Sequence, residues 1–338
     1  MYRFLPMIVL LACSQSVLAA PEVLTSIQPL QLIAQRILGE QGRSEVLLPP
    51  GASPHAFSLR PSDSKRFARA DAFFWIGPDM ENFLLKLVDS RPQHSHAMQQ
   101  LPGLELLHYD QEHNHDHDHD HDHDHDHDHD HDHDHDHDHD HDHGHDHDHD
   151  EHVGKAQSGL RQHDHHHQPG GLDAHLWLST ANARVIAAFM AQEFARLHPA
   201  AAEHYQANLQ AFNHELGTLD VELHELLQQV RGKPFFVFHE AFNYFEHSYG
   251  LQHTGVFALS AEVQPGARHV QDMREALEQA GASCIFTEPP APPRLAHSLA
   301  RGLTVHLQEL DPLGSRADSY AGLMRSMAAA MHQCLEPL

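Results

Sequence analysis

The sequence has little cysteine, little positive charge, and no long apolar run after its first twenty residues. It contains 3 cysteines, and its 21 lysines and arginines stand against 48 aspartates and glutamates. This balance excludes a nucleic-acid partner, which would require a basic surface. No later segment reaches the 18 or so apolar residues of a membrane-spanning helix, so the mature chain is expected to be soluble.

Histidine is what the sequence has in excess. Of its 40 histidines, 24 lie between positions 113 and 167, and His113 to Asp150 is almost pure His-Asp alternation. Imidazole suits zinc, copper and nickel while carboxylate suits harder ions, so the run indicates metal binding. The alternative, an acidic tail that only solvates the protein, gives no reason for imidazole.

The negative charge is concentrated in the same segment. Between Asp110 and His167, 21 acids stand against 2 bases, a balance of −19 within a total of −27, so the rest carries −8. We therefore expect a disordered insert over residues 110–171. Without the insert and a leader, roughly 260 to 270 residues remain, which suits two domains of about 130 residues each.

The first twenty residues are typical of a cleaved secretory signal. Arg3 precedes an apolar stretch from Phe4 to Ala12, and small residues at Ala19 and Ala20 offer cleavage sites. We expect a periplasmic protein; the alternative is lipoprotein anchoring at Cys13. Removing Cys13 leaves the pair Cys284 and Cys334 in an oxidising compartment. We predict a disulfide between them, with two buried thiols as the alternative.

Apolar strand patterns and helical patterns alternate along the rest of the chain, which predicts parallel sheets in an α/β fold. Before the insert, the expected strands are 22–27, 45–48, 72–76 and 104–107, and the expected helices are 30–38, 61–69 and 81–90. After residue 230, the expected strands are 235–238, 255–259, 283–287 and 305–310, and the expected helices are 241–249, 270–280, 295–301 and 320–334.

The stretch between these alternations is helical over some fifty residues, with a break at His198-Pro199. We therefore predict an N-terminal α/β lobe over 21–198, a linking helix over 199–230 and a C-terminal α/β lobe over 231–338. Each lobe has a mostly parallel sheet flanked by helices, and a metal site lies in the cleft between the lobes.

Four metal-competent side chains occupy positions where an α/β fold places ligands, near the carboxyl ends of strands. His55 follows the strand 45–48, His239 directly follows the strand 235–238, and Glu288 follows the strand 283–287. His175 lies in the turn after the insert. Three imidazoles and one oxygen donor are a normal zinc set, so the coincidence predicts a zinc site.

The chain resembles the periplasmic zinc-binding proteins of bacterial zinc-uptake ABC transporters, within the metal-binding cluster of solute-binding proteins. The matching stretches, spread over the mature chain, are Gly51-Ala52-Ser53-Pro54-His55, Leu59-Arg60-Pro61-Ser62-Asp63, Trp75-Ile76-Gly77-Pro78, His175-Leu176-Trp177-Leu178-Ser179, Phe236-Val237-Phe238-His239-Glu240-Ala241-Phe242, Gln264-Pro265-Gly266-Ala267, Glu288-Pro289 and Leu310-Asp311-Pro312-Leu313-Gly314. The family is similar too in carrying a His- and acid-rich insert before the second ligand.

The resemblance implies that His55, His175 and His239 bind zinc as the transported ligand, and that Cys284 and Cys334 are bonded. Manganese-binding relatives tend to have a carboxylate in place of His239, so imidazole there favours zinc. The partners implied are an inner-membrane permease and a cytoplasmic ATPase, and we expect a monomer.

One departure concerns the fourth ligand. Some zinc-binding relatives use an acid directly before the first histidine, but this chain has Pro54, which has no donor side chain. The fourth ligand is then water, Glu288 or a residue of the insert.

Two other functions remain as alternatives. A three-histidine zinc with an open position also suits a hydrolase, but the sequence has no H-E-x-x-H motif, and we expect no enzyme. A periplasmic metal buffer dominated by the insert is the other alternative. In the transport hypothesis, the insert gathers or buffers zinc beside the specific site.

Overall fold

The computed structural model describes residues 20–109, 170–258, 266–289 and 294–338, all of which belong to one compact unit. Nearly all of the expected leader, with Cys13, nearly all of the insert, and Gln264 and Pro265 lie outside the described residues. Within these ranges, no helix is both long enough and apolar enough to cross a membrane.

The first sheet is wholly parallel, with the strand order β2-β1-β3-β4. Its strands are β1 (Glu22–Thr25), β2 (Arg43–Val46), β3 (Ala72–Trp75) and β4 (Ser95–Ala97), and its helices are α1 (Gln28–Leu38), α2 (Pro61–Arg69) and the short α3 (Leu85–Val88). Pro61 occupies the first turn of α2, where its missing N–H is no loss, and the Arg60 N–H donates to the Asp63 carboxylate at 2.8 Å. Gly39, with φ 56°, ends α1 as predicted.

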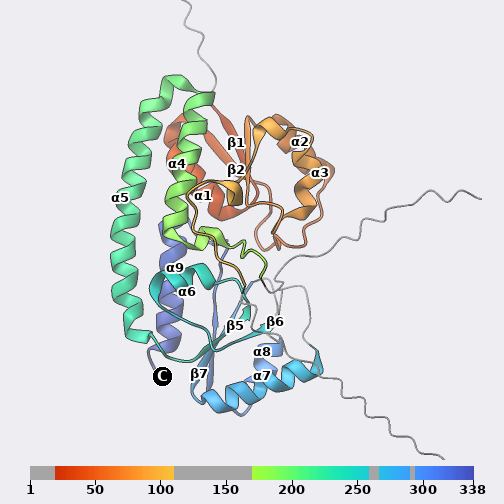
Figure 1. The fold of residues 1–338 in the computed structure, drawn as a ribbon, viewed down its shortest axis with the longest axis vertical. Coiled ribbons are helices and arrows are strands. Elements are labelled where there is room, and N and C mark those ends of the chain that lie inside the picture. The colour runs from red at the N-terminus through yellow and green to blue at the C-terminus, as the bar shows by residue number, and fades with distance from the viewer. Residues whose placement is uncertain (1–19, 110–169, 259–265, 290–293) are drawn as a thin grey trace, which may run out of the picture. The chain divides into compact units, whose positions relative to one another are not determined.

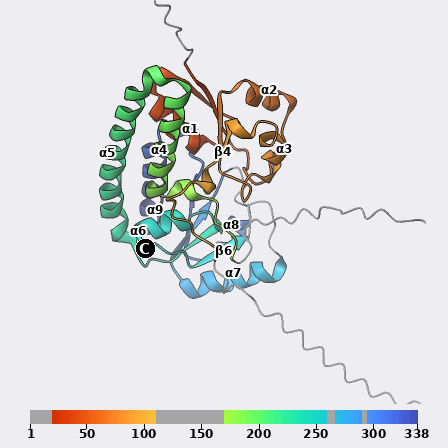
Figure 2. The same cartoon turned by 45° about the horizontal axis from the view of Figure 1, so that its top comes forward.

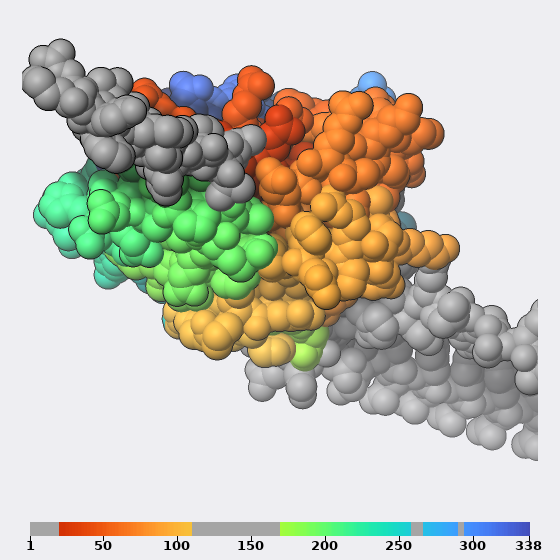
Figure 3. Space-filling view, turned by 90° about the horizontal axis from the view of Figure 1, so that it is seen from above, coloured from red at the N-terminus to blue at the C-terminus, as the bar shows by residue number. Residues whose placement is uncertain are grey.

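The prediction of a strand at 104–107 is wrong. The last strand of this sheet is β4, and the backbone of 104–107 is instead bonded to distant side chains. Asn182 on the helix α4 (Thr180–Leu197) accepts from the Glu105 N–H and donates to its carbonyl, both at 2.9 Å, and the Tyr244 hydroxyl accepts from the Leu107 N–H at 3.0 Å. These bonds replace those of a sheet ladder. Figure 3 shows gold surface from the stretch before the insert beside the green surface of the stretch after it.

Two other predictions have the right type of element but the wrong bounds. The second strand lies at Arg43–Val46 instead of 45–48, and the helix expected over 81–90 is reduced to α3 with a 3₁₀ turn at Asn82–Leu84 before it. Glu81 lies directly before this 3₁₀ turn. Its carboxylate folds back to accept from the backbone N–H groups of Ile76 and Gly77, at 2.7 and 3.3 Å.

Two long helices follow the insert, with the break at His198-Pro199 where it was predicted. After α4 and a 3₁₀ turn at Pro199–Ala201, α5 runs from Ala202 to Leu227. Its buried face consists of Tyr205, Phe212, Leu216, Leu219, Leu223 and Leu227, at the three- and four-residue spacing of an amphipathic helix. This face packs against α1 and α4 beside the first sheet and against α6 and α9 beside the second (Figures 1 and 2).

The second sheet repeats the arrangement of the first, with parallel strands in the order β6-β5-β7-β8. Its strands are β5 (Phe235–His239), β6 (Gly255–Ala258), β7 (Ser283–Thr287) and β8 (Val305–Glu309), and its helices are α6 (Asn243–Tyr249), α7 (Ala267–Ala280), α8 (Arg294–Leu299) and α9 (Tyr320–Leu335). A disulfide joins Cys284 in β7 to Cys334 in α9, which confirms the predicted pairing. The predicted fold class, two parallel α/β halves with one long helix between them, is confirmed.

Candidate metal centre

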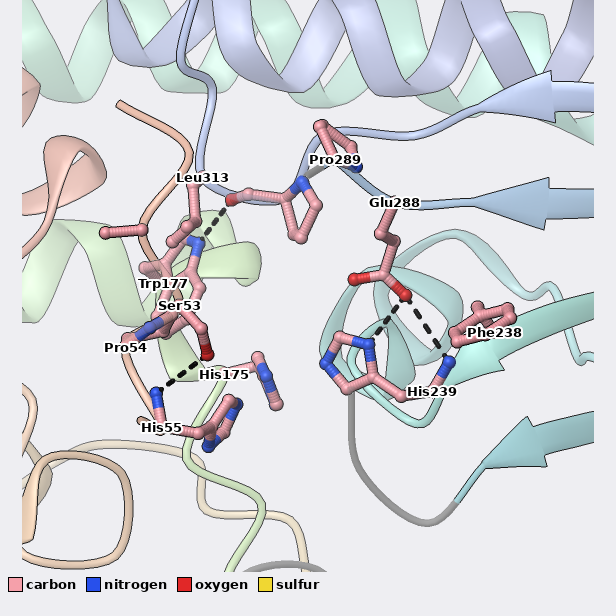
Figure 4. A pocket seen from close by; sticks show the side chains of 12 residues that line it. Ser53, Pro54, His55, His175, Trp177, Phe238, His239, Glu288, Pro289 and Leu313 are labelled. Carbon is pink, nitrogen blue, oxygen red and sulfur yellow. Dashed lines mark hydrogen bonds and ion pairs between the residues drawn. The ribbon is translucent and has the colours of Figure 1, made fainter. Parts of the chain in front are cut away.

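Three histidines from distant segments of the chain meet at one pocket. One nitrogen from each of His55, His175 and His239 lies within 4.8 Å of the other two, and the ring centroids are 5.4 to 6.0 Å apart. Figure 4 shows the three rings turned toward one space. Among the described residues, no other histidines, cysteines or acids form a group of three with metal-binding geometry. The structure thus brings together the three histidines that the sequence singled out.

His55 reaches the pocket from the loop that follows β2. Gly51, with φ 78°, provides the turn in this loop that a residue with a side chain rarely adopts. The Ser53 hydroxyl then accepts from the His55 backbone N–H at 3.2 Å, which fixes the approach of the chain. His55 is the most exposed of the three ring-bearing residues, while the other two are nearly fully buried.

His175 is held by the aspartate two residues before it. Its ring Nδ1 lies 2.8 Å from Asp173 Oδ1, and its backbone N–H donates to the same oxygen at 3.0 Å. Burial raises the pKa of the Asp173 carboxyl to about 7, and hydrogen bonds from the His175 backbone and the Tyr109 hydroxyl oppose that rise. A carboxylate at Nδ1 places the ring proton there and leaves the Nε2 lone pair for a metal.

His239 is the last residue of β5, one position earlier relative to the strand end than predicted. Because β5 and β7 are parallel neighbours that pair Phe235 with Cys284, the same register carries His239 to the level of Glu288. Glu288 Oε1 lies 2.7 Å from His239 Nδ1 and also accepts from the His239 backbone N–H at 3.4 Å. Figure 4 shows the Glu288 carboxylate on the far side of the His239 ring from the other two histidines.

The pocket around the histidines is small and mostly apolar. Its walls include Trp177, Phe238, Pro289, Pro312 and Leu313, and its free space is about 50 Å³. The Trp177 indole N–H donates to the Pro312 carbonyl at 2.8 Å, which ties one wall to the loop after β8. Pockets for organic ligands typically hold about 300–1,000 Å³. The space therefore suits an ion with one or two waters rather than an organic solute.

Two functional features were not found from the sequence. Asp173 was not proposed as a partner of His175, although an acid two residues before a candidate ligand in a turn was a usable signal. Glu288 was proposed as one of three candidates for the fourth ligand, beside water and a residue of the insert, and the structure places it against His239 Nδ1. Only the parallel register of β5 and β7, which the sequence did not supply, explains that contact.

Comparisons with known proteins agree over nearly the whole chain. The sequence profile of ZnuA, "zinc-uptake complex component A periplasmic", matches residues 23–334. The high-affinity zinc uptake system protein ZnuA of Haemophilus influenzae is 37% identical over 334 residues, covering 96% of this chain and 97% of that protein. The protein of the same name from Yersinia pestis is 34% identical over 325 residues, covering 94% and 92%.

Solved structures agree on the fold. A crystal structure of ZnuA matches with a TM-score of 0.69 at 21% identity, covering 94% of this chain and 99% of that one. The solute-binding protein FpvC from Pseudomonas aeruginosa, in complex with Mn²⁺, matches with a TM-score of 0.68 at 18% identity, covering 94% and 99%. Because proteins with different metals in their names or complexes share this fold, the fold alone does not determine which metal ion binds.

The two parallel halves and the three-histidine pocket define a metal-binding solute-binding protein. The chain belongs to the ZnuA family of periplasmic zinc-uptake components, since the family profile and relatives above 30% identity both cover most of its length.

Proposed function

We propose that this protein captures zinc with His55, His175 and His239 and delivers it to an inner-membrane permease, whose cytoplasmic ATPase drives uptake. The observation that carries the proposal is the convergence of one nitrogen from each histidine within 4.8 Å in a small pocket. Two Zn–N bonds of about 2.0–2.1 Å span at most about 4.2 Å. The proposal therefore requires the side chains to move the three nitrogens closer together when they bind one ion.

The donor set and the charges favour zinc. Three neutral imidazoles suit zinc better than manganese or calcium, which prefer oxygen ligands. Asp173 and Glu288, both buried, add two carboxylates directly behind two of the rings. A bound divalent cation favours the ionised form of the Asp173 carboxyl, whose pKa is raised by burial. The negative charges of the two carboxylates balance the charge of the ion in a pocket that water screens poorly.

We propose water as the fourth ligand and a positioning role for Glu288. Its Oε1 is engaged at 2.7 Å with His239 Nδ1, as in the carboxylate–histidine–zinc arrangement common to zinc sites. An open or water-filled position suits a carrier, because the cargo must leave again. We expect no enzymatic activity, and zinc-loaded protein should hydrolyse ester and peptide substrates no faster than free zinc does.

The leader, the insert and the linking helix complete the proposal. Residues 1–20 direct the chain to the periplasm and are removed there. The insert gathers zinc weakly and buffers it. The linking helix, proposed as 199–230, packs against helices beside both sheets through α5 and restricts the relative motion of the lobes 21–198 and 231–338.

Deleting residues 113–167 distinguishes the carrier from a metal buffer dominated by the insert. The carrier retains one tightly bound zinc per chain after the deletion, because the three histidines lie outside it. Zinc titration against a competing chelator, on the full-length and shortened proteins, measures the tight site separately from the weak ones. Loss of most zinc affinity on deletion would support the buffer instead.

A further inference from the structure

The ends of the insert are held together by a short antiparallel neck. The Tyr109 N–H donates to the Gly171 carbonyl at 3.0 Å, and the Gly170 N–H donates to the Tyr109 carbonyl at 2.9 Å. One step further in, the Asp173 N–H donates to the Leu107 carbonyl at 2.9 Å. The chain therefore leaves for the insert and returns from it at the same place. The neck ends at Asp173, two residues before His175.

A buried polar network lies at the base of this neck. The Tyr109 hydroxyl donates to Asp173 Oδ1 at 3.2 Å, the oxygen that also contacts His175 Nδ1. On the other side, the Tyr244 hydroxyl donates to the Asp173 carbonyl at 2.9 Å. Tyr109 is 5% exposed and Asp173 is fully buried, so water does not replace these donors.

Resting on the proposed function, we propose that Tyr109 is a positioning residue for zinc capture. Its hydroxyl holds the Asp173 carboxylate in the orientation that fixes the His175 ring with Nε2 toward the pocket. The base of the histidine-rich insert and the metal pocket thus share one hydrogen-bonded chain, Tyr109–Asp173–His175.

The geometry explains why a tyrosine serves here. Asp173 Oδ1 accepts from the His175 backbone and faces the His175 ring, and a third donor is needed to stop the carboxylate from turning. Burial raises the pKa of the Tyr109 hydroxyl well above its usual value, so the group stays a donor. Because Tyr109 is fixed in the neck by two backbone bonds, its ring has little freedom to move away.

The test compares Tyr109→Phe with Tyr205→Phe in the full-length protein. Each change removes one hydroxyl from a buried tyrosine, but Tyr205 bonds to the Gln41 carbonyl and His198, which do not line the pocket. The affinity for the first zinc equivalent is measured by chelator competition, because this equivalent fills the tightest site before the weaker sites of the insert bind zinc. We expect Tyr109→Phe to weaken it about tenfold, the lower end for loss of an orienting partner, and Tyr205→Phe to stay within about twofold of wild type.

A double-mutant cycle with Asp173→Asn shows whether Tyr109 acts through Asp173. We expect Tyr109→Phe to cost less than about threefold in that background, because the partner it positions is already altered. In metal-free protein, the ¹⁵N shifts of the His175 ring, assigned by their loss in His175→Ala, should move from the Nδ1-protonated form toward a mixture in Tyr109→Phe only.

Three results would overturn the proposal: equal zinc affinity in Tyr109→Phe and Tyr205→Phe, additive costs in the cycle, or unchanged His175 shifts. Failure of the proposed function looks different, since the wild-type protein itself would then lack a tight zinc. The shift measurement needs no metal and separates the two cases.

Discussion

Replacing His239 with alanine is expected to lower zinc affinity at the pocket at least a hundredfold. The change removes one of three nitrogens that lie within 4.8 Å of one another. It also leaves the Glu288 carboxylate buried without the ring it now contacts at 2.7 Å. Losing a metal ligand should cost more than losing an orienting partner, which costs about 10–100-fold. Chelator competition for the first zinc equivalent measures the effect.

The matched control for this change is His204→Ala. His204 is an exposed residue of α5 and does not line the pocket, so its loss should leave the first zinc equivalent unchanged. Thermal unfolding provides a second reading, since a ligand that binds only the folded state raises the melting temperature. Zinc should raise it in wild type and His204→Ala and much less in His239→Ala. Equal affinity in the two variants would remove His239 from the site.

Replacing Glu288 is expected to produce the second largest effect, and its two variants should differ. Glu288→Ala removes the acceptor at His239 Nδ1, so zinc affinity should fall about 10–100-fold. Glu288→Gln keeps an oxygen that can accept from Nδ1, so it should retain most of the affinity. If Glu288 were a metal ligand instead, the amide would cost nearly as much as alanine, because it loses the charge that binds the ion.

Glu309→Ala is the control for Glu288. Glu309 ends the neighbouring strand β8, at the position that pairs with Thr287, but it is exposed and does not line the pocket. Its removal tests whether a negative charge near this sheet edge is enough to affect zinc binding. We expect no change. No effect of Glu288→Ala would mean that His239 needs no positioning carboxylate.

Much of the fold could be predicted where local sequence and final structure agree. The helix at Pro61–Arg69 and the strand at Ser283–Thr287 have the predicted bounds, since proline starts the first and an apolar run between small residues marks the second. The prediction of a strand at 104–107 failed because the hydrogen-bond partners of this segment, Asn182 and Tyr244, lie 77 and 137 residues further along the chain. Nothing local reveals such partners.

The candidate site, like the fold, has a part that the sequence predicted and a part that it did not. His55, His175, His239 and Glu288 were selected because they are metal-competent residues at chain positions where α/β folds place ligands. The family resemblance then implied that the three histidines are the ligands, and the structure brings these three together. Their supporting carboxylates depend on geometry that the sequence does not state. The contact of Glu288 requires the β5–β7 register, and that of Asp173 requires the turn that leads into His175.

The most direct test of the zinc site is anomalous X-ray scattering at the zinc edge from crystals grown with one equivalent of zinc. We predict one dominant peak, about 2.0–2.1 Å from a nitrogen of each of His55, His175 and His239. A dominant peak elsewhere, or one that lacks any of these three rings as a ligand, would contradict the account.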